Sequence, residues 1–226
     1  RSISDGQVSA PVAPRGQRSL LDRRGEVTAV GSEAGTLYGP PIERFTRFWL
    51  LAGEHTLFVV DRIRAARPVT TVWNWLLNHR DDESTIAVLG PHAVAMRRRL
   101  AGLKLFHLAG ARLNGPIYAH VHDAYHPEPD QLGEGRSGSG WLYRWMESSP
   151  REFRVAVHAV AVDHAGQMPD WAATSSDREY SLANGEIRWT LEVESAEPLS
   201  LLLRSEGSAR KWRVAEVGGR WTLVGG

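Results

Sequence analysis

The segment from Arg44 to Trp75 constrains the fold more than any other part of the chain, because it has the pattern of three consecutive β-strands. Phe45 to Leu51 is rich in aromatic and aliphatic residues, and Thr56 to Ile63 is apolar with two charged residues. Ala52 to His55 has the length of a hairpin connection. Because strand side chains alternate, the second strand is expected to place on one face Leu57, Val59 and Asp61, and on the other Phe58, Val60 and Arg62.

Runs with the composition of strands continue through the rest of the chain. They are Glu26 to Val30, Val69 to Leu77, Phe153 to Val162, Ile187 to Val193 and Leu199 to Arg204. Asn184-Gly185 and Gly218-Gly219 have the composition of two-residue hairpin turns. Val94 to Leu105 lacks the apolar stripe of a helix and is interpreted as strand edge and turn. The sequence predicts an all-β fold with little or no helix, a two-layer antiparallel β-sandwich that forms a single domain over residues 1–226.

Composition excludes several classes of protein. The formal net charge is +1, so no strong field favours nucleic acid as a partner. Cysteine is absent, which excludes disulfides and thiolate chemistry and leaves the compartment open. No apolar stretch has the length of a membrane span, and the first residues carry no secretory signal, so no membrane partner is expected.

The segment around residues 110–140 is rich in glycine and proline and is predicted to be a long loop, the type of segment that often carries function. If it is extended near its start, His120 and His122 point to one face, where they could share a zinc ion with Asp123 or His126 as a third ligand. The alternative is a polar loop in which backbone carbonyls bind these histidines, with no metal and no other cofactor.

Other roles for the same loop rest on residue type. Candidates for proton transfer are His122 or Tyr125, and candidates for substrate binding are His120, His126, Arg136 and Trp141. Most of the nine tryptophans are expected in the core, with one or two exposed near the loop. His158, within a strand, is interpreted as a structural histidine on the face opposite Val155 and Val157.

The pattern Arg47-x-Trp49, hairpin, Phe58 to Arg62, and then Trp73-x-Trp75 resembles the C-terminal β-sandwich of the heparinase II/III family of polysaccharide lyases. In that family an α-helical toroid precedes the sandwich, a tyrosine and histidines at the junction act as base and acid, and histidines with an aspartate often hold zinc. The toroid and the family's His-Asn segment are not in this sequence, and no position matches the family's catalytic or metal motifs. Asp61 and Arg62 are expected to fix a strand end.

The resemblance implies a bacterial, periplasmic or secreted parent protein in which this chain follows a toroid. The chain is expected to form one wall of the cleft of a lyase that cleaves uronate-containing polysaccharide, such as heparin, heparan sulfate or alginate, by β-elimination. It is expected to be inactive alone. The alternative is a free-standing β-sandwich that binds carbohydrate or another protein without catalysis.

Overall fold

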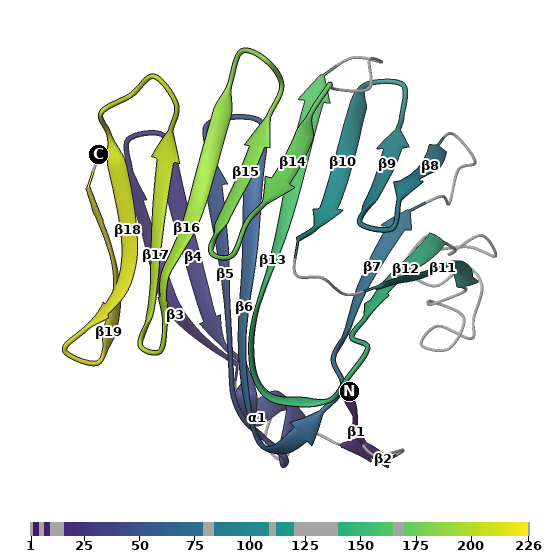
Figure 1. Ribbon diagram of the computed structural model, residues 1–226, viewed down its shortest axis with the longest axis vertical. Coiled ribbons are helices and arrows are strands. Elements are labelled where there is room, and N and C mark those ends of the chain that lie inside the picture. The colour runs from purple at the N-terminus through teal and green to yellow at the C-terminus, as the bar shows by residue number, and fades with distance from the viewer. Residues whose placement is uncertain are drawn as a thin grey trace, which may run out of the picture.

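The computed structural model describes residues 2–4, 7–9, 16–78, 84–108, 112–119, 140–164 and 170–225. Antiparallel strands make up nearly all of it, as Figure 1 shows, and the four-residue helix α1 (Gly35–Tyr38) is the one helix among these residues. The largest sheet has eight strands, which in order across the sheet are β3 (Gln17–Arg24), β4 (Val27–Glu33), β5 (Ile42–Ala52), β6 (Thr56–Val69), β13 (Arg151–His164), β10 (Ala101–His107), β9 (Ala93–Arg97) and β8 (Thr85–Gly90).

Three further sheets complete the described chain. The six-stranded sheet is a meander of β14 (Ala172–Ser175), β15 (Glu179–Ala183), β16 (Arg188–Ala196), β17 (Leu199–Ser205), β18 (Lys211–Val217) and β19 (Arg220–Gly225). The small sheet has three strands in the order β11 (Arg112–Ala119), β12 (Gly140–Met146) and β7 (Val72–Asn78). β1 (Ser2–Ser4) pairs with β2 (Gln7–Ser9).

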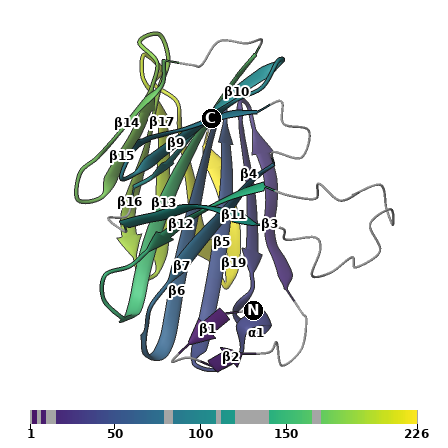
Figure 2. The ribbon, with the colours of Figure 1, turned by 90° about the vertical axis from the view of Figure 1, so that its right-hand side faces the viewer.

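Alternation along the long strands sends side chains to both faces of the large sheet. Phe58 and Val60 of β6 are buried against the six-stranded sheet, in a core that includes Leu201 and Trp212. The opposite face is covered in part by the small sheet, whose β11 and β12 run across the direction of β5 and β6 (Figure 2). The large sheet is therefore the middle layer over part of its area.

The predicted all-β sandwich is confirmed, and the alternation predicted for residues 56–63 is the one observed. Both predicted hairpins are present, since β15 and β16 flank Asn184-Gly185 and β18 and β19 flank Gly218-Gly219. Val94 to Leu105 is strand, turn and strand. The small sheet adds a third layer, because the chain leaves the large sheet after β6 and the next strand, β7, pairs with β12.

One sequence expectation is wrong. Asp61 and Arg62 do not fix a strand end, since β6 continues to Val69. The aliphatic run ends near Ile63, but pairing with β13 continues to Arg64 and, after an irregularity, includes Val69. Asp61 lies in the middle of the strand and joins two layers, as the site below shows.

Candidate functional site

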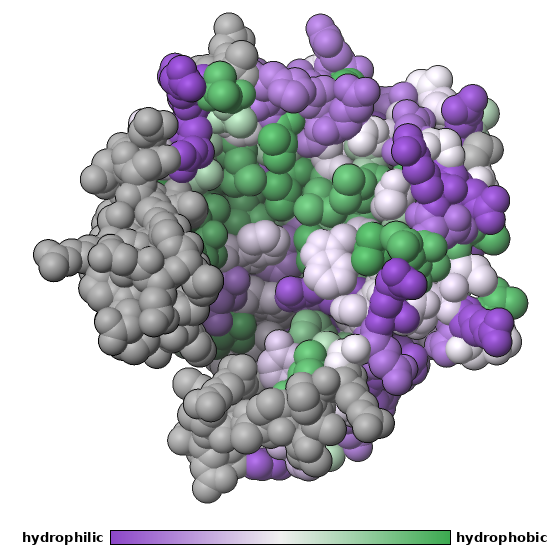
Figure 3. Space-filling view, turned by 180° about the vertical axis from the view of Figure 1, so that it is seen from behind, coloured by the Kyte–Doolittle hydropathy of each residue, from purple (hydrophilic) through white to green (hydrophobic). Residues whose placement is uncertain are grey.

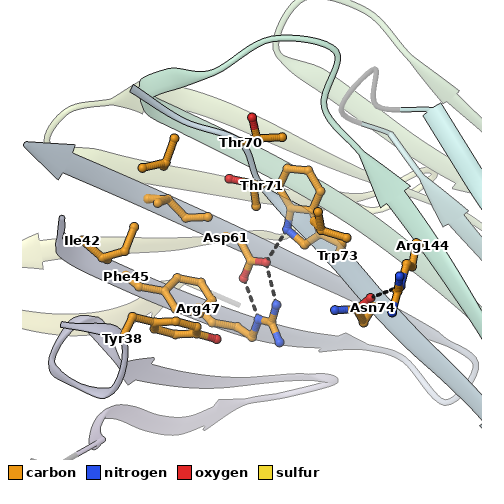
Figure 4. Close-up of a pocket in the computed structure, with 13 residues that line it drawn as sticks. Tyr38, Ile42, Phe45, Arg47, Asp61, Thr70, Thr71, Trp73, Asn74 and Arg144 are labelled. Carbon is orange, nitrogen blue, oxygen red and sulfur yellow. Dashed lines mark hydrogen bonds and ion pairs between the residues drawn. The ribbon is translucent and has the colours of Figure 1, made fainter. Parts of the chain in front are cut away.

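A pocket of about 410 Å³ lies where the small sheet meets the large sheet. β5 and β6 supply one side of it, β7 and β12 the other, and the stretch Val69 to Val72 connects the two. Aromatic and polar side chains share the lining, which includes Tyr38, Phe45, Arg47, Asp61, Trp73, Asn74 and Arg144 (Figure 4). Its size and mixed lining are those of a small-molecule site.

The buried carboxylate of Asp61 lies in the wall of the pocket and accepts hydrogen bonds from two side chains. Arg47 Nε and Nη2 donate to the two oxygens of Asp61 at 2.6 and 2.7 Å, a bidentate pair. Trp73 Nε1 of β7 donates to Asp61 Oδ2 at 2.9 Å. Asp61 is fully buried and Arg47 is about one-third exposed, so the guanidinium is the part of the pair that faces the pocket.

Two pKa values are shifted here. Burial alone lowers the pKa of the Arg47 guanidinium, but its hydrogen bonds to Asp61 and the charge of that carboxylate outweigh burial, and the pKa is raised. Burial raises the pKa of the Tyr38 phenol, and the charge of Asp61 adds to the effect while Arg47 opposes it. Tyr38 therefore stays protonated near neutral pH and can donate a hydrogen bond, but it is poorly suited to act as a base.

The rim on the other side carries a second arginine. Asn74 of β7 and Arg144 of β12 are directly opposite each other in the small sheet, and Arg144 Nε donates to Asn74 Oδ1 at 3.1 Å. Asn74 is exposed, Arg144 is half-buried, and Asn74 lies between Arg47 and Arg144 in Figure 4. The rim therefore presents an amide and a guanidinium to a ligand.

Beyond the pocket, the same face of the large sheet is open. Cross-strand pairing places Leu21, Val30 and Trp49 in one row, and Leu51 lies in the next. Leu21 is 58% exposed and Leu51 46%. Seen from behind in Figure 3, this side of the molecule is hollowed and hydrophobic side chains gather on its floor.

Two buried histidines lie deeper between the sheets. His107 Nδ1 and His158 Nδ1 are 3.1 Å apart, and the rings are surrounded by Trp73, Trp75 and Trp145. Burial lowers the pKa of His107 to about 2, with further lowering by His158 and His92. Burial lowers the pKa of His158 to about 3, with Arg47 adding to the effect. Both rings are neutral at physiological pH, and one of them donates its Nδ1–H to Nδ1 of the other.

Most of the site residues predicted from the sequence cannot be placed. The loop candidates outside the described residues are His120, His122, Asp123, Tyr125, His126 and Arg136, so their roles stay predictions. The backbone of Trp141 lies in β12, between Tyr118 of β11 and Leu77 of β7. His158 is on the predicted face, opposite Val157.

Most of the described tryptophan side chains are in the core, as the sequence predicts. The buried ones are Trp73, Trp145, Trp171, Trp189, Trp212 and Trp221. Trp49 and Trp75 are half-buried.

Sequence reasoning missed the pocket, although one signal for it was present. The hairpin between β5 and β6 pairs Ala52 with Thr56, and counting back from that pair brings Arg47 opposite Asp61. Alternation then sends both side chains to one face. Arg144 carried no comparable signal, since its partner strand is far away in the sequence.

Neither a metal nor a membrane site is found in the part of the chain that the structure describes. No three histidine, aspartate or glutamate side chains there are grouped so that they could hold a metal ion. None of the described helical segments has the length and apolar character needed to cross a membrane.

No family model and no curated protein matches this sequence. Solved structures do match in fold. A mutant of the heparan sulfate lyase HepC from Pedobacter heparinus matches with a TM-score of 0.59 and 12% identity, over 96% of this chain and 30% of that chain. The same lyase without the mutation matches with a TM-score of 0.58 and 12% identity, over 99% and 29%. A heparinase III matches with a TM-score of 0.55 and 9% identity, over 93% and 27%.

The chain thus spans less than a third of the length of these lyases, while nearly all of it is matched. The resemblance that Arg47-x-Trp49 and Phe58 to Arg62 indicate in the sequence is confirmed at the level of the fold. This chain has the fold of one part of the heparinase III-type lyases.

Proposed function

We propose that this chain is a domain of a polysaccharide lyase-type protein that acts on uronate-containing polysaccharide by β-elimination. In this proposal the chain forms one wall of the cleft, and an α-helical toroid elsewhere in the parent protein supplies the base. The parent protein works in the periplasm or outside the cell, where such polymers are found. The observation that carries the proposal is the match in fold to heparan sulfate lyase structures over 96–99% of this chain.

The pocket supports this function in a second way. It combines an aromatic wall, formed by Tyr38 and Phe45, with planar polar groups at Arg47 and Asn74. Sugar rings offer an apolar face for aromatic stacking and hydroxyl groups for fixed donors and acceptors. By contrast, the pKa of the Tyr38 phenol is raised by burial, so this group is poorly suited to act as the base.

The test is affinity electrophoresis of the isolated chain in gels that contain heparan sulfate, alginate or hyaluronan, with dextran as the neutral control. We expect migration to be slowed by at least one acidic polymer and not by dextran. No new absorbance from an unsaturated uronate product should develop in the same mixtures. Equal migration in all gels would contradict the proposal, and product formation that is lost on His122→Ala or Tyr125→Phe would contradict the need for a second domain.

The second candidate is a free-standing sandwich that binds carbohydrate without catalysis. It is favoured by the mixed aromatic and polar lining of the pocket, which is of the kind that can hold a sugar ring. If the full-length gene product carries no toroid and this chain alone binds a defined oligosaccharide, this second function is preferred. If affinity rises strongly in the parent protein, the cleft-wall function is preferred.

A further inference from the structure

We propose that the pocket binds a single acidic sugar residue, and that Arg144 at its rim determines specificity by pairing with the carboxylate of that residue. The ligand class rests on the proposed function, but the assignment of Arg144 rests on the geometry of the pocket. Arg47 then serves the hydroxyl side of the ring, because its charge is already balanced by Asp61.

The first step is the charge of the lining. In the described lining of the pocket three side chains are charged, namely Arg47, Asp61 and Arg144. Arg47 and Asp61 neutralise each other through two short hydrogen bonds. Among the described residues Arg144 has an amide oxygen, that of Asn74, as its hydrogen-bond partner and no carboxylate. The described residues therefore give the pocket one net positive charge, which matches a ligand with one negative charge.

The second step concerns the groups left available for a ligand. Asp61 is fully buried and accepts three hydrogen bonds from Arg47 and Trp73, so its charge is directed to these partners and not to a ligand. The remaining polar groups at the surface of the pocket are mainly donors, from Arg47, Arg144, Asn74 and Tyr38. A donor-rich, positively charged site selects a ligand with many acceptor oxygens, and a uronate ring is such a ligand.

The third step is the separation of roles between the two arginines. Arg47 is fixed by Asp61 from below and lies over the rings of Phe45 and Trp49, at 5.4 and 5.8 Å from their centroids. It is preorganised and cannot turn to follow a ligand. Among the described residues Arg144 is held through Nε alone, and its two terminal nitrogens are then available for the planar fork that a carboxylate accepts.

The volume limits how much of a polymer can enter. About 410 Å³ is near the lower end of the range of small-molecule sites, so the pocket takes a chain end or one in-line residue and not a long segment. The open face next to it, with Trp49 and Leu51, offers a surface for the neighbouring sugars. The acidic sugar bound in the pocket would then determine which neighbouring sugars of the polymer lie on this open face.

The test compares three tetrasaccharide probes by calorimetry: a uronate tetrasaccharide, its carboxyl-reduced form, and the carboxyl-reduced form bearing sulfate. Arg144→Gln is expected to weaken binding of the uronate probe by tenfold or more, on the order of one charge-assisted hydrogen bond. The same substitution should leave the carboxyl-reduced probe unchanged, and Arg144→Lys should recover part of the lost affinity. The matched control is Arg188→Gln, which removes the same charge from an exposed pair with Glu206 on the six-stranded sheet and should change nothing.

Two results would overturn the assignment. One is unchanged uronate affinity in an Arg144→Gln variant whose melting temperature matches the wild type. The other is a sulfated, carboxyl-reduced probe that binds as tightly as the uronate probe and depends equally on Arg144, which would make sulfate the recognised group.

The outcomes also separate this inference from the proposed function. Retention by acidic polymers with no effect of Arg144→Gln removes the inference and leaves the function. Binding of free glucuronate that perturbs the Trp73 indole signal in nuclear magnetic resonance and requires Arg144, without retention by any polymer, supports the pocket and removes the function.

Discussion

The two faces of the eight-stranded sheet belong to the same strands but pack in different ways. The face toward the six-stranded sheet is mainly apolar, with Phe48, Phe58, Leu201 and Trp212 almost fully buried, although Arg62 on this face is buried and pairs with Glu197. The face toward the small sheet also buries large aromatic side chains. Among them, however, lie the Arg47–Asp61 pair and the two histidines, together with Arg154, which contacts Glu147 and donates to Val69 O.

This difference indicates that one face mainly stabilises the fold and the other mainly provides the binding site. Apolar area buried between two large sheets is the main source of stability in such a fold. Buried ion pairs contribute little net stability relative to well-packed apolar groups, but they lose much when one partner is removed. The second interface, between the large sheet and the small sheet, is thus the less stable of the two, and it is the one that contains the pocket. This is expected if its residues serve binding.

The largest effect is expected from removing a core side chain of the first interface. Trp212 and Trp145 are both fully buried, Trp212 between the two large sheets and Trp145 in the small sheet against His107. Trp212→Ala should lower the free energy of unfolding by about 3–5 kcal/mol and affect the whole chain. Trp145→Ala should mainly speed hydrogen exchange in β7 and β12 and leave β16 and β17 protected. Equal loss of protection in both sheets would show that the interfaces are one cooperative unit.

Acid should act on the second interface through its histidines. The folded-state pKa values of His107 and His158 are about 2 and about 3, below the unfolded value of about 6.5. Between these limits the unfolded state binds more protons, so stability is full above pH 6.5 and falls as the pH decreases. Two such groups reduce the free energy of unfolding by up to about 3 kcal/mol for each pH unit below 6.5.

Urea unfolding between pH 7.5 and pH 5 measures this effect. In the double variant His107→Leu/His158→Leu the decrease over that range should be largely absent, because neither side chain can bind a proton. As the pH is lowered to 5, the hydrogen-exchange protection factors of the wild type should decrease first in β7 and β12. A wild type and a double variant with the same pH dependence would show that other groups govern acid stability.

The two interfaces also differ in how far the sequence predicted them. Alternation in Thr56 to Ile63 and the glycine hairpin at Gly218-Gly219 are local patterns, and they lead directly to the meander and the apolar core. The pairing of Arg47 with Asp61 is also local, since a single hairpin connects them. It could have been derived from the turn, but the resemblance drew attention to Asp61 as a strand-end residue.

The small sheet could not be derived in this way. β7 and β12 are far apart in the sequence, and nothing in either strand specifies the other as its partner, so Asn74 opposite Arg144 is visible only in three dimensions. The histidines illustrate the same limit. His158 was correctly placed on a face, but its contact with His107 depends on the pairing of β10 with β13. The sequence instead indicates a metal or proton-transfer site in the histidine-rich segment His120 to His126, because its candidate residues are neighbours in the sequence.

The smallest expected effect concerns one hydrogen bond across the second interface. Trp73→Phe keeps an aromatic ring against His107 but removes the Nε1–H that donates to Asp61 at 2.9 Å. The matched control is Trp221→Phe in the first interface, where the ring packs edge-on against Phe48 and no hydrogen bond of its nitrogen is found among the described residues. Both substitutions lose similar apolar area. Trp73→Phe should therefore cost about 1.5–3 kcal/mol more, the contribution of a hydrogen bond to a charged group. If chemical unfolding gives equal losses for the two variants, the Arg47–Asp61 pair is held by Arg47 alone, and the small sheet does not position the guanidinium that faces the pocket.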